Sequence, residues 1–239
     1  ESNINPGKTI SILAPNATIL FTSFPETAGY FKNNNIKQII CSGNPVRNIF
    51  SNPISQEEAR LKFGLESDVR TVLVVGGSLG SRVINQCIEA HIDDFALNHI
   101  QLIWQTGSNY EVKSRDRRNV VQMDFIDDMA AAYSAADLVV SRSGASALTE
   151  LAIVGKPSIL IPFQMGLNDE QIQNARYLEK MNAAVVLSQE SIDALLFHTI
   201  LNLLNNPARL KEMQIILKRL AKPNASEIIA EAILNKMDE

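Results

Sequence analysis

The sequence predicts an α/β domain built on a doubly wound parallel sheet. Short runs rich in β-branched residues alternate with helical patterns from Thr71 to Val186, which is typical of consecutive strand–helix–strand units. The runs are apolar along most of their length, as expected for strands buried on both faces. With 46% apolar and 20% charged residues, the chain can also fill a sizeable core. The expected strands are 71–75, 101–105, 119–123, 137–141, 157–162 and 183–187.

Helices are expected between these strands and at the end of the chain. After Ser188 the pattern becomes helical. Asn206 followed by Pro207 is typical of an N-cap with proline in the first turn, and Asn224 with Glu227 has capping-box spacing. We therefore expect two or three C-terminal helices. Between the strands, helices are expected to begin after Gly80, near Ser108, at Asp127, after Gly144 and near Asn168.

Residues 1–46 have the pattern of only part of a domain. Two strands, 17–23 and 36–43, flank one short helix, 25–32. Two strands and a helix cannot bury a core alone. We interpret this segment as the C-terminal remnant of another α/β domain whose beginning is missing. Docking of both strands onto the main sheet is the alternative.

Composition and charge exclude several classes of protein. The formal net charge is −4 with a pI near 5.5, and basic residues form no stripe, so no nucleic-acid partner is expected. No apolar run approaches the roughly 18 residues of a transmembrane helix. Cys41 and Cys87 have neither metal-site nor disulfide spacing and are expected to be buried packing residues. Without an Asp-x-Asp motif or a His/Cys cluster, we expect neither a metal nor a cofactor.

A glycine-rich loop, Gly76-Gly77-Ser78-Leu79-Gly80, joins the strand 71–75 to a helix. Free backbone N–H groups and the positive end of the helix dipole make such a junction an anion-binding loop. Tight turn geometry alone is the alternative. The dinucleotide fingerprint G-x-G-x-x-G and the Gly-Lys-Ser/Thr of a P-loop are both absent, so a different phosphate ligand is needed.

A second strand–helix junction combines a fixed cation, Arg142, with the small residues Ser143, Gly144, Ala145, Ser146 and Ala147, and could hold a diphosphate. Glu150 follows about two turns into the helix, where its carboxylate could accept hydrogen bonds from two vicinal sugar hydroxyls. A carboxylate that only favours the helix dipole is the alternative. Sugar binding predicts that Glu150→Ala weakens nucleotide binding with little change in stability, whereas a dipole role predicts the reverse.

Two further junctions carry candidate ligands. In the segment 124–129, Phe125 and Ile126 could face a flat base while the backbone reads its edge, although Asp127 is explained equally well as an N-cap. The polar segment 168–174 includes the amides Gln171 and Asn174, which suit sugar hydroxyls; a solvated helix start is the alternative. These loops all follow strands, where open α/β sheets bind nucleotides.

In this order, the motifs resemble the MurG family of glycosyltransferases along nearly the whole chain. Members transfer N-acetylglucosamine from UDP-N-acetylglucosamine to a lipid-linked muramyl peptide (lipid I to lipid II) in peptidoglycan synthesis. The resemblance implies a two-domain GT-B fold. Residues 1–46 would end the acceptor-binding domain, 47–222 would form the Rossmann-like UDP-sugar domain, and 223–239 would be a terminal helix crossing back. The matching motifs are 43–47, 76–80, 105–107, 125–129, 142–145, 149–150, Gln171 and 174–175.

The resemblance also implies roles for individual residues. Arg47 and Ser78 would contact the phosphate region of the donor, and Ile126 would read uracil. The backbone of 144–147 would meet the diphosphate, and Glu150 would bind the ribose. The sugar would contact Gln171 and, from the other domain, Asn3, next to Ser2, which replaces a Gln of the family motif. Glu170 replaces the family's His or Gln, which leaves that sugar contact open.

Catalysis itself is not assigned to any residue of this chain. The resemblance places the general base in a glycine-rich loop of the N-terminal domain, and it implies a peripheral enzyme on the cytoplasmic face of the cell membrane. A donor-binding subunit of a split enzyme is the alternative, which the sequence upstream of Glu1 would discriminate. A nicotinamide oxidoreductase is disfavoured by the absent fingerprint.

Overall fold

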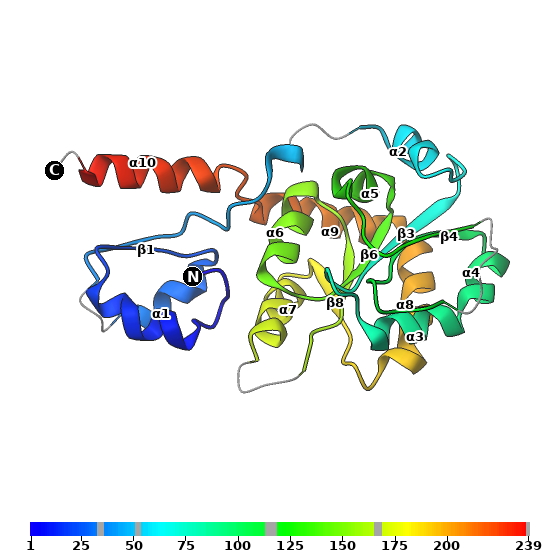
Figure 1. Ribbon diagram of the computed structural model, residues 1–239, viewed down its shortest axis with the longest axis horizontal. Helices are drawn as coiled ribbons and strands as arrows, with labels where there is room; N and C mark the ends of the chain where they lie inside the picture. The colour runs from blue at the N-terminus through cyan, green and yellow to red at the C-terminus, as the bar shows by residue number, and fades with distance from the viewer. Residues whose placement is uncertain (33–35, 51–53, 113–118, 165–168, 238–239) are drawn as a thin grey trace.

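A six-stranded parallel sheet forms the centre of the computed structural model, which describes residues 1–32, 36–50, 54–112, 119–164 and 169–237 (Figure 1). The strand order is β5-β4-β3-β6-β7-β8, and every pairing is parallel. All six expected strands are confirmed. Their bounds are β3 Arg70–Val75, β4 Ile100–Gln105, β5 Val120–Met123, β6 Leu138–Ser141, β7 Ser158–Leu160 and β8 Ala184–Val186.

Both faces of the sheet are buried, which explains why its central strands are apolar. Successive residues of a strand point to opposite faces. Leu73 and Ile103 accordingly pack with residues of α5, α6 and α7, whereas Val74 and Trp104 pack with residues of α3, α4 and α8. All four side chains are fully buried. Cys87 lies in the second cluster, as expected, where burial raises the pKa of its thiol to about 12.

Most of the expected helices are confirmed. Ser81 caps α3, Asn206 caps α9, and α6 begins directly after Gly144. The helix expected at Asp127 begins two residues later, because Asp128, not Asp127, accepts the capping hydrogen bond from the N–H of Ala131. The helix bounds are α2 Gln56–Lys62, α3 Arg82–Ala90, α4 Ile92–Leu97, α5 Met129–Ala135, α6 Ala145–Val154, α7 Glu170–Lys180, α8 Ile192–Leu204, α9 Pro207–Leu220 and α10 Ala225–Met237.

The helix expected near Ser108 is wrong for the residues described there. Residues 106–112 form turns and irregular chain, and 113–118 lie outside the described residues. Instead the crossover from β3 to β4 carries two helices, α3 and α4. The local reason is the turn after β4, where Gly107 adopts a positive φ of 80° that a helix does not accommodate.

The N-terminal segment forms a separate small lobe (Figure 1). Its elements are α1 Lys8–Leu13, the 3₁₀ helices Ala14–Asn16 and Pro25–Phe31, and the strands β1 Ile19–Phe21 and β2 Gln38–Ile40. The two strands pair in parallel with each other and not with the six-stranded sheet, so docking onto the main sheet is wrong. Ala14, Leu20 and Phe31 form its small core. Cys41 is only partly buried, contrary to expectation, and its carbonyl accepts a hydrogen bond from Lys222 Nζ at 2.6 Å.

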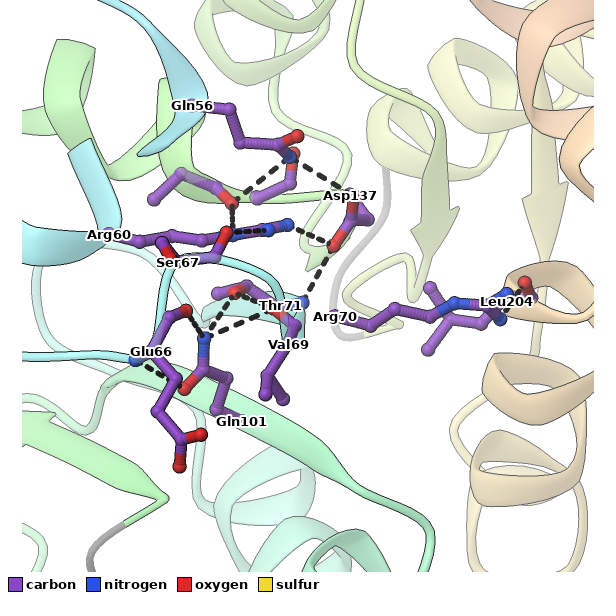
Figure 2. A network of polar contacts seen from close by, with 12 residues as sticks. Gln56, Arg60, Glu66, Ser67, Val69, Arg70, Thr71, Gln101, Asp137 and Leu204 are labelled. Atoms are coloured by element: carbon purple, nitrogen blue, oxygen red, sulfur yellow. Dashed lines mark hydrogen bonds and ion pairs between the residues drawn. The ribbon is translucent and has the colours of Figure 1, made fainter. Parts of the chain in front are cut away.

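At the amino ends of the strands, a network of buried polar contacts ties α2 to the sheet (Figure 2). The side chain of Arg60 is 7% exposed and forms an ion pair of 2.6 Å with Asp137, which precedes β6. Arg60 also donates to the carbonyls of Ala135 and Ser67, and the N–H of Thr71 donates to Asp137 Oδ2 at 2.7 Å. The guanidinium and the carboxylate are therefore both multiply bonded.

Replacing Asp137 with Ala should destabilise the chain strongly. A buried Arg60 that loses its counter-ion costs about 3–5 kcal/mol, because the remaining charge is uncompensated. Glu212→Ala is the matched control, since its pair with Arg209 is a surface contact worth at most about 1 kcal/mol. Urea denaturation of both variants checks this expectation. Equal losses would show that the Arg60 pair contributes no more than a surface pair.

A buried lysine makes the stability of the chain depend on alkaline pH. Burial lowers the pKa of Lys156 to about 8, and its ammonium donates to the carbonyls of Ser134 and Ala136. Between about pH 8 and 10 the folded state therefore binds fewer protons than the unfolded state, so stability rises with pH by at most about 1.4 kcal/mol per unit. The variant Lys156→Met lacks this contribution to the pH dependence of stability.

We expect the free energy of unfolding of the wild type to increase, relative to that of Lys156→Met, as pH rises from 8 to 10. Chemical denaturation of both proteins at half-unit intervals measures the difference and cancels the titration of other groups. A constant difference across this range would contradict a depressed lysine pKa.

Candidate functional site

The candidate site lies where the direction of strand addition reverses. From β3 the chain first adds β4 and β5 on one side, and then adds β6, β7 and β8 on the other. At such a reversal the loops after the two central strands diverge, and open α/β sheets bind ligands in the crevice between these loops. The loops that leave here are 76–81 and 142–144, and both lead into helices.

The glycine-rich loop is held by direct backbone contact with the loop after β4. Gly80 and Gly107 have positive φ angles of 75° and 80°. A Cβ on Gly80 would overlap the carbonyl oxygen of Thr106, and a Cβ on Gly107 would overlap that of Leu79. Asn85 of α3 donates to the Thr106 carbonyl at 2.8 Å from the helix side. The glycines are therefore required by the turn geometry, and Ser78 is exposed at the tip of the turn.

Arg142 is bonded to protein groups as well as facing the crevice. Its guanidinium donates to the carbonyls of Ile161 and Pro162, at 3.0 and 3.2 Å, and to Ser81 Oγ at 2.7 Å. It also lies 5.4 Å from the ring centroid of Phe163. At least three of its five N–H donors are thus occupied, so Arg142 joins the loops after β3, β6 and β7 rather than standing as an uncommitted cation.

The N-terminus of α6 presents backbone donors to the crevice. Gly144 is its N-cap residue and offers no side chain to bond the first N–H groups, those of Ala145, Ser146 and Ala147. Uncapped N–H groups and the helix dipole attract an anion. The side chain of Ser143 is a different matter. It is fully buried and donates to the carbonyl of Gln171 at 2.8 Å, so this hydroxyl joins the loop after β6 to the start of α7.

Glu150 is held in place by a buried tyrosine. Its Oε2 accepts a hydrogen bond from the hydroxyl of Tyr133 at 3.0 Å. Partial burial raises the pKa of Glu150, while the Tyr133 bond and the charge of nearby Arg47 oppose that rise. Within the described part of the chain, Oε1 has no hydrogen-bond partner. The expectation that Glu150→Ala leaves stability unchanged is therefore revised, since Tyr133, 3% exposed, would lose its acceptor.

The loop after β5 is held by the side chain of Gln105, at the end of β4. The side chain of Ile126 is 1% exposed, and its N–H donates to Gln105 Oε1 at 2.8 Å. The expectation that this side chain faces a base is wrong, because it belongs to the core. The backbone carbonyl of Ile126 and the ring of Phe125, which is 54% exposed, are what this loop can offer to a flat ligand.

Asn174 joins the small lobe to the main domain. It is fully buried, donates to Asn3 Oδ1 at 2.9 Å and to the Ser143 carbonyl at 3.3 Å, and accepts from the N–H of Ile4 at 3.1 Å. A sugar-binding role for the Asn174 amide is wrong, because the protein uses its donors and its acceptor. The same bonds hold Asn3, a residue of the other lobe, against the site.

The remaining predicted residues lie around the crevice with less constraint. Gln171 accepts from the N–H of Phe163 at 3.0 Å through Oε1, and its NH₂ group has no partner among the residues that the structure describes. Glu170 is partly buried at the start of α7, and Arg47 is exposed. A separate cavity of about 930 Å³ runs along α3 and is lined by Ser81, Arg82, Asn85, Thr106, Tyr110 and neighbouring residues. Of the predicted site residues, none lines that cavity.

Sequence reasoning missed two residues that position the site. Both side chains, those of Gln105 and Tyr133, are 3% exposed; Gln105 bonds to the loops on either side of it, and the Tyr133 hydroxyl donates to Glu150. A polar residue at the end of an otherwise apolar strand was a usable signal for Gln105. Tyr133 gave no signal, because its partner Glu150 belongs to a different helix.

The residues that the structure describes meet neither the requirements of a metal site nor those of a membrane-spanning helix. There, no group of three or more His, Cys, Asp or Glu side chains could hold a metal ion. Within the same residues, no helix has both the length and the apolar character needed to cross a bilayer.

Comparisons with known proteins agree with this geometry. Over 242 residues the chain is 36% identical to the UDP-N-acetylglucosamine--N-acetylmuramyl-(pentapeptide) pyrophosphoryl-undecaprenol N-acetylglucosamine transferase of Flavobacterium psychrophilum, covering 100% of this chain and 65% of that protein. The enzyme of the same name from Porphyromonas gingivalis W83 is 38% identical, with 98% and 63% covered. The chain thus spans about two thirds of the length of these relatives.

Solved structures and a family model give the same result. The crystal structure of Acinetobacter baumannii MurG matches with a TM-score of 0.76 and 26% identity, covering 98% of this chain and 65% of that one. A UDP co-structure of S. aureus MnaA matches with a TM-score of 0.67 at 11% identity, covering 95% and 63%, which shows a shared fold alone. Residues 71–229 match the model of the glycosyltransferase family 28 C-terminal domain. The chain therefore belongs to glycosyltransferase family 28 and has the parallel α/β fold of GT-B glycosyltransferases.

Proposed function

We propose that this chain binds UDP-N-acetylglucosamine as the sugar donor of a hexosaminyltransferase. The observation that carries the proposal is the crevice between β3 and β6, where the uncapped N-terminus of α6 lies beside the glycine-rich loop. Two helix N-termini that meet at one crevice suit a diphosphate. The activity named for the relatives suggests which sugar nucleotide binds.

Each part of the donor has a matching group in the crevice. The diphosphate would bind the N–H groups of 145–147 and the loop that carries Ser78, with Arg47 as an exposed cation nearby. Uracil would lie against Phe125 and the carbonyl of Ile126. The ribose would bind the unpaired Oε1 of Glu150, and the sugar would contact the NH₂ group of Gln171, with Glu170 and Asn3 beside it.

The reaction we propose is an inverting transfer. The hydroxyl oxygen of the acceptor attacks the anomeric carbon, its proton passes to a base, and the bond to the diphosphate breaks so that UDP leaves. Helix N-termini stabilise the charge of the leaving group without a metal ion. Neither lobe of this chain supplies a residue that we assign as the base.

The names of the relatives support a proposal for the acceptor, and the chemistry of that acceptor supports one for the location. A lipid-linked muramyl peptide is the acceptor in those names, and this substrate is anchored in a membrane. We propose that the longer protein works at the cytoplasmic surface of the cell membrane as a peripheral enzyme. In it, this chain would supply the donor half of the site.

Glu150→Gln should weaken UDP binding by about one to two orders of magnitude. A charge-assisted hydrogen bond to the ribose is worth roughly 1.5–3 kcal/mol, and each 1.4 kcal/mol is tenfold in affinity. Glutamine keeps an oxygen for the Tyr133 hydroxyl, so the fold loses less than it would with Ala. Isothermal titration calorimetry with UDP measures the change, and no heat from the wild type at millimolar UDP would sink the proposed function.

Two controls separate ribose binding from support of the fold. Tyr133→Phe removes the hydroxyl but keeps the carboxylate, so UDP affinity should fall less than about threefold while stability drops by about 1 kcal/mol. The analogue 2′-deoxy-UDP should bind the wild type more weakly and lose little further in Glu150→Gln. Equal penalties for removing the 2′-hydroxyl in both proteins would show that Glu150 does not touch it.

Metal removal should leave UDP binding unchanged. Helix N-termini and arginine would meet the charge of the diphosphate, and carboxylates that could hold Mg²⁺ are not grouped among the described residues. We expect the affinity for UDP in excess EDTA to equal that in millimolar Mg²⁺ within about twofold, which is under 0.5 kcal/mol. Loss of binding in EDTA would require a metal site and contradict this mode of recognition.

A further inference from the structure

Gln105 stands between the two loops that would hold the two ends of the nucleotide. It is the last residue of β4, paired in register with Val75, the last residue of β3, and with Met123, the last residue of β5. The loop 76–80 leaves the sheet on one side of it, and the loop 124–128 leaves on the other. Its side chain is 3% exposed.

The amide of Gln105 uses its donor on one loop and its acceptor on the other. Nε2 donates to the carbonyl of Gly77 at 2.8 Å, and Oε1 accepts from the N–H of Ile126 at 2.8 Å. The Gly77 carbonyl also accepts from the N–H of Gly80 at 3.0 Å, which closes the turn. One rigid planar group therefore fixes the spacing between the glycine-rich loop and the loop that carries Phe125.

We propose that Gln105 is a positioning residue that couples the glycine-rich loop 76–80 to the loop 124–128, so that the diphosphate and uridine halves of the nucleotide bind cooperatively. This inference rests on the proposed function. Without the amide, each loop keeps its own contacts, but their separation is no longer set. Binding of a ligand that spans both loops then includes the free-energy cost of ordering them, whereas binding of a ligand that touches only one loop does not.

Replacing the amide with a carboxyl group distinguishes coupling of the two loops from general support of the fold, because only coupling predicts a pH-dependent loss of binding. In Gln105→Glu, a carboxylate can accept from the Ile126 N–H but faces the Gly77 carbonyl with an oxygen that cannot donate. Protonation restores a donor, and burial favours the protonated form of a carboxyl group. The coupling should therefore fail at high pH and return at low pH.

Gln101 is the matched control. It is also a glutamine of β4, is 2% exposed, and lies four residues from Gln105 at the other end of the strand (Figure 2). Its Nε2 donates to the carbonyls of Glu66 and Val69, and its Oε1 accepts from the N–H of Glu66. Gln101→Glu thus places the same charge in the same strand, away from the crevice.

The experiment is calorimetry of the whole chain with UDP and with uridine, at pH 8 and pH 5.5. For Gln105→Glu at pH 8 we expect UDP affinity to fall at least about tenfold relative to the wild type, the value of one lost hydrogen bond, and uridine affinity to fall less than about threefold. At pH 5.5 the deficit for UDP should shrink below about threefold. Dividing by the wild type at each pH removes the ionisation of the phosphate itself.

Gln105→Met guards against a variant that misfolds because of a buried charge. It should lose UDP affinity at least about tenfold at both pH values, while Gln101→Glu stays within about twofold of the wild type. The inference is overturned if both Gln105 variants bind UDP within threefold of the wild type, if uridine loses as much as UDP, or if low pH restores nothing to Gln105→Glu. A wild type that does not bind UDP overturns the proposed function itself.

Discussion

The backbone contact between the loops that follow β3 and β4 sets the positions of the groups at this end of the sheet. Gly80 and Gly107 touch without side chains between them, and each would clash with the other loop if it carried a Cβ. That approach brings the start of α3 close to the sheet, where Ser81 both caps the helix and accepts from Arg142. The relative positions of these two loops therefore depend on contacts among backbone groups.

Most of the buried polar side chains at the site form hydrogen bonds within the protein, because burial removes them from water. An amide or hydroxyl that leaves water must find a partner inside the protein. Ser143, Asn174 and Gln105 meet that requirement by bonding to backbone groups of neighbouring loops. The groups that we assign to a ligand therefore include backbone N–H donors and the second oxygen of Glu150, beside the exposed side chains of Ser78 and Arg47.

The sequence was sufficient to predict the sheet and the loops, but not which polar side chains of the loops bond within the protein. Apolar runs such as 71–75 and 101–105 identify strands because burial on both faces demands them, and the glycines before a helix identify the tight loop 76–80. Whether a polar residue points to ligand or to protein depends on distant partners. Asn174 meets Asn3, 171 residues away in the chain, and Glu150 meets Tyr133 of another helix, so neither pairing is visible in local spacing.

The small N-terminal lobe shows how a second unit can be attached without sharing a sheet. Its strands pair only with each other, yet the N–H of Ile4 and the side chain of Asn3 bond to a buried amide of α7, next to the crevice. Lys222 adds a second connection by donating to the Cys41 carbonyl. The first connection reaches α7 and the second reaches the segment between α9 and α10, so the small lobe is tied to the main domain at two separate points.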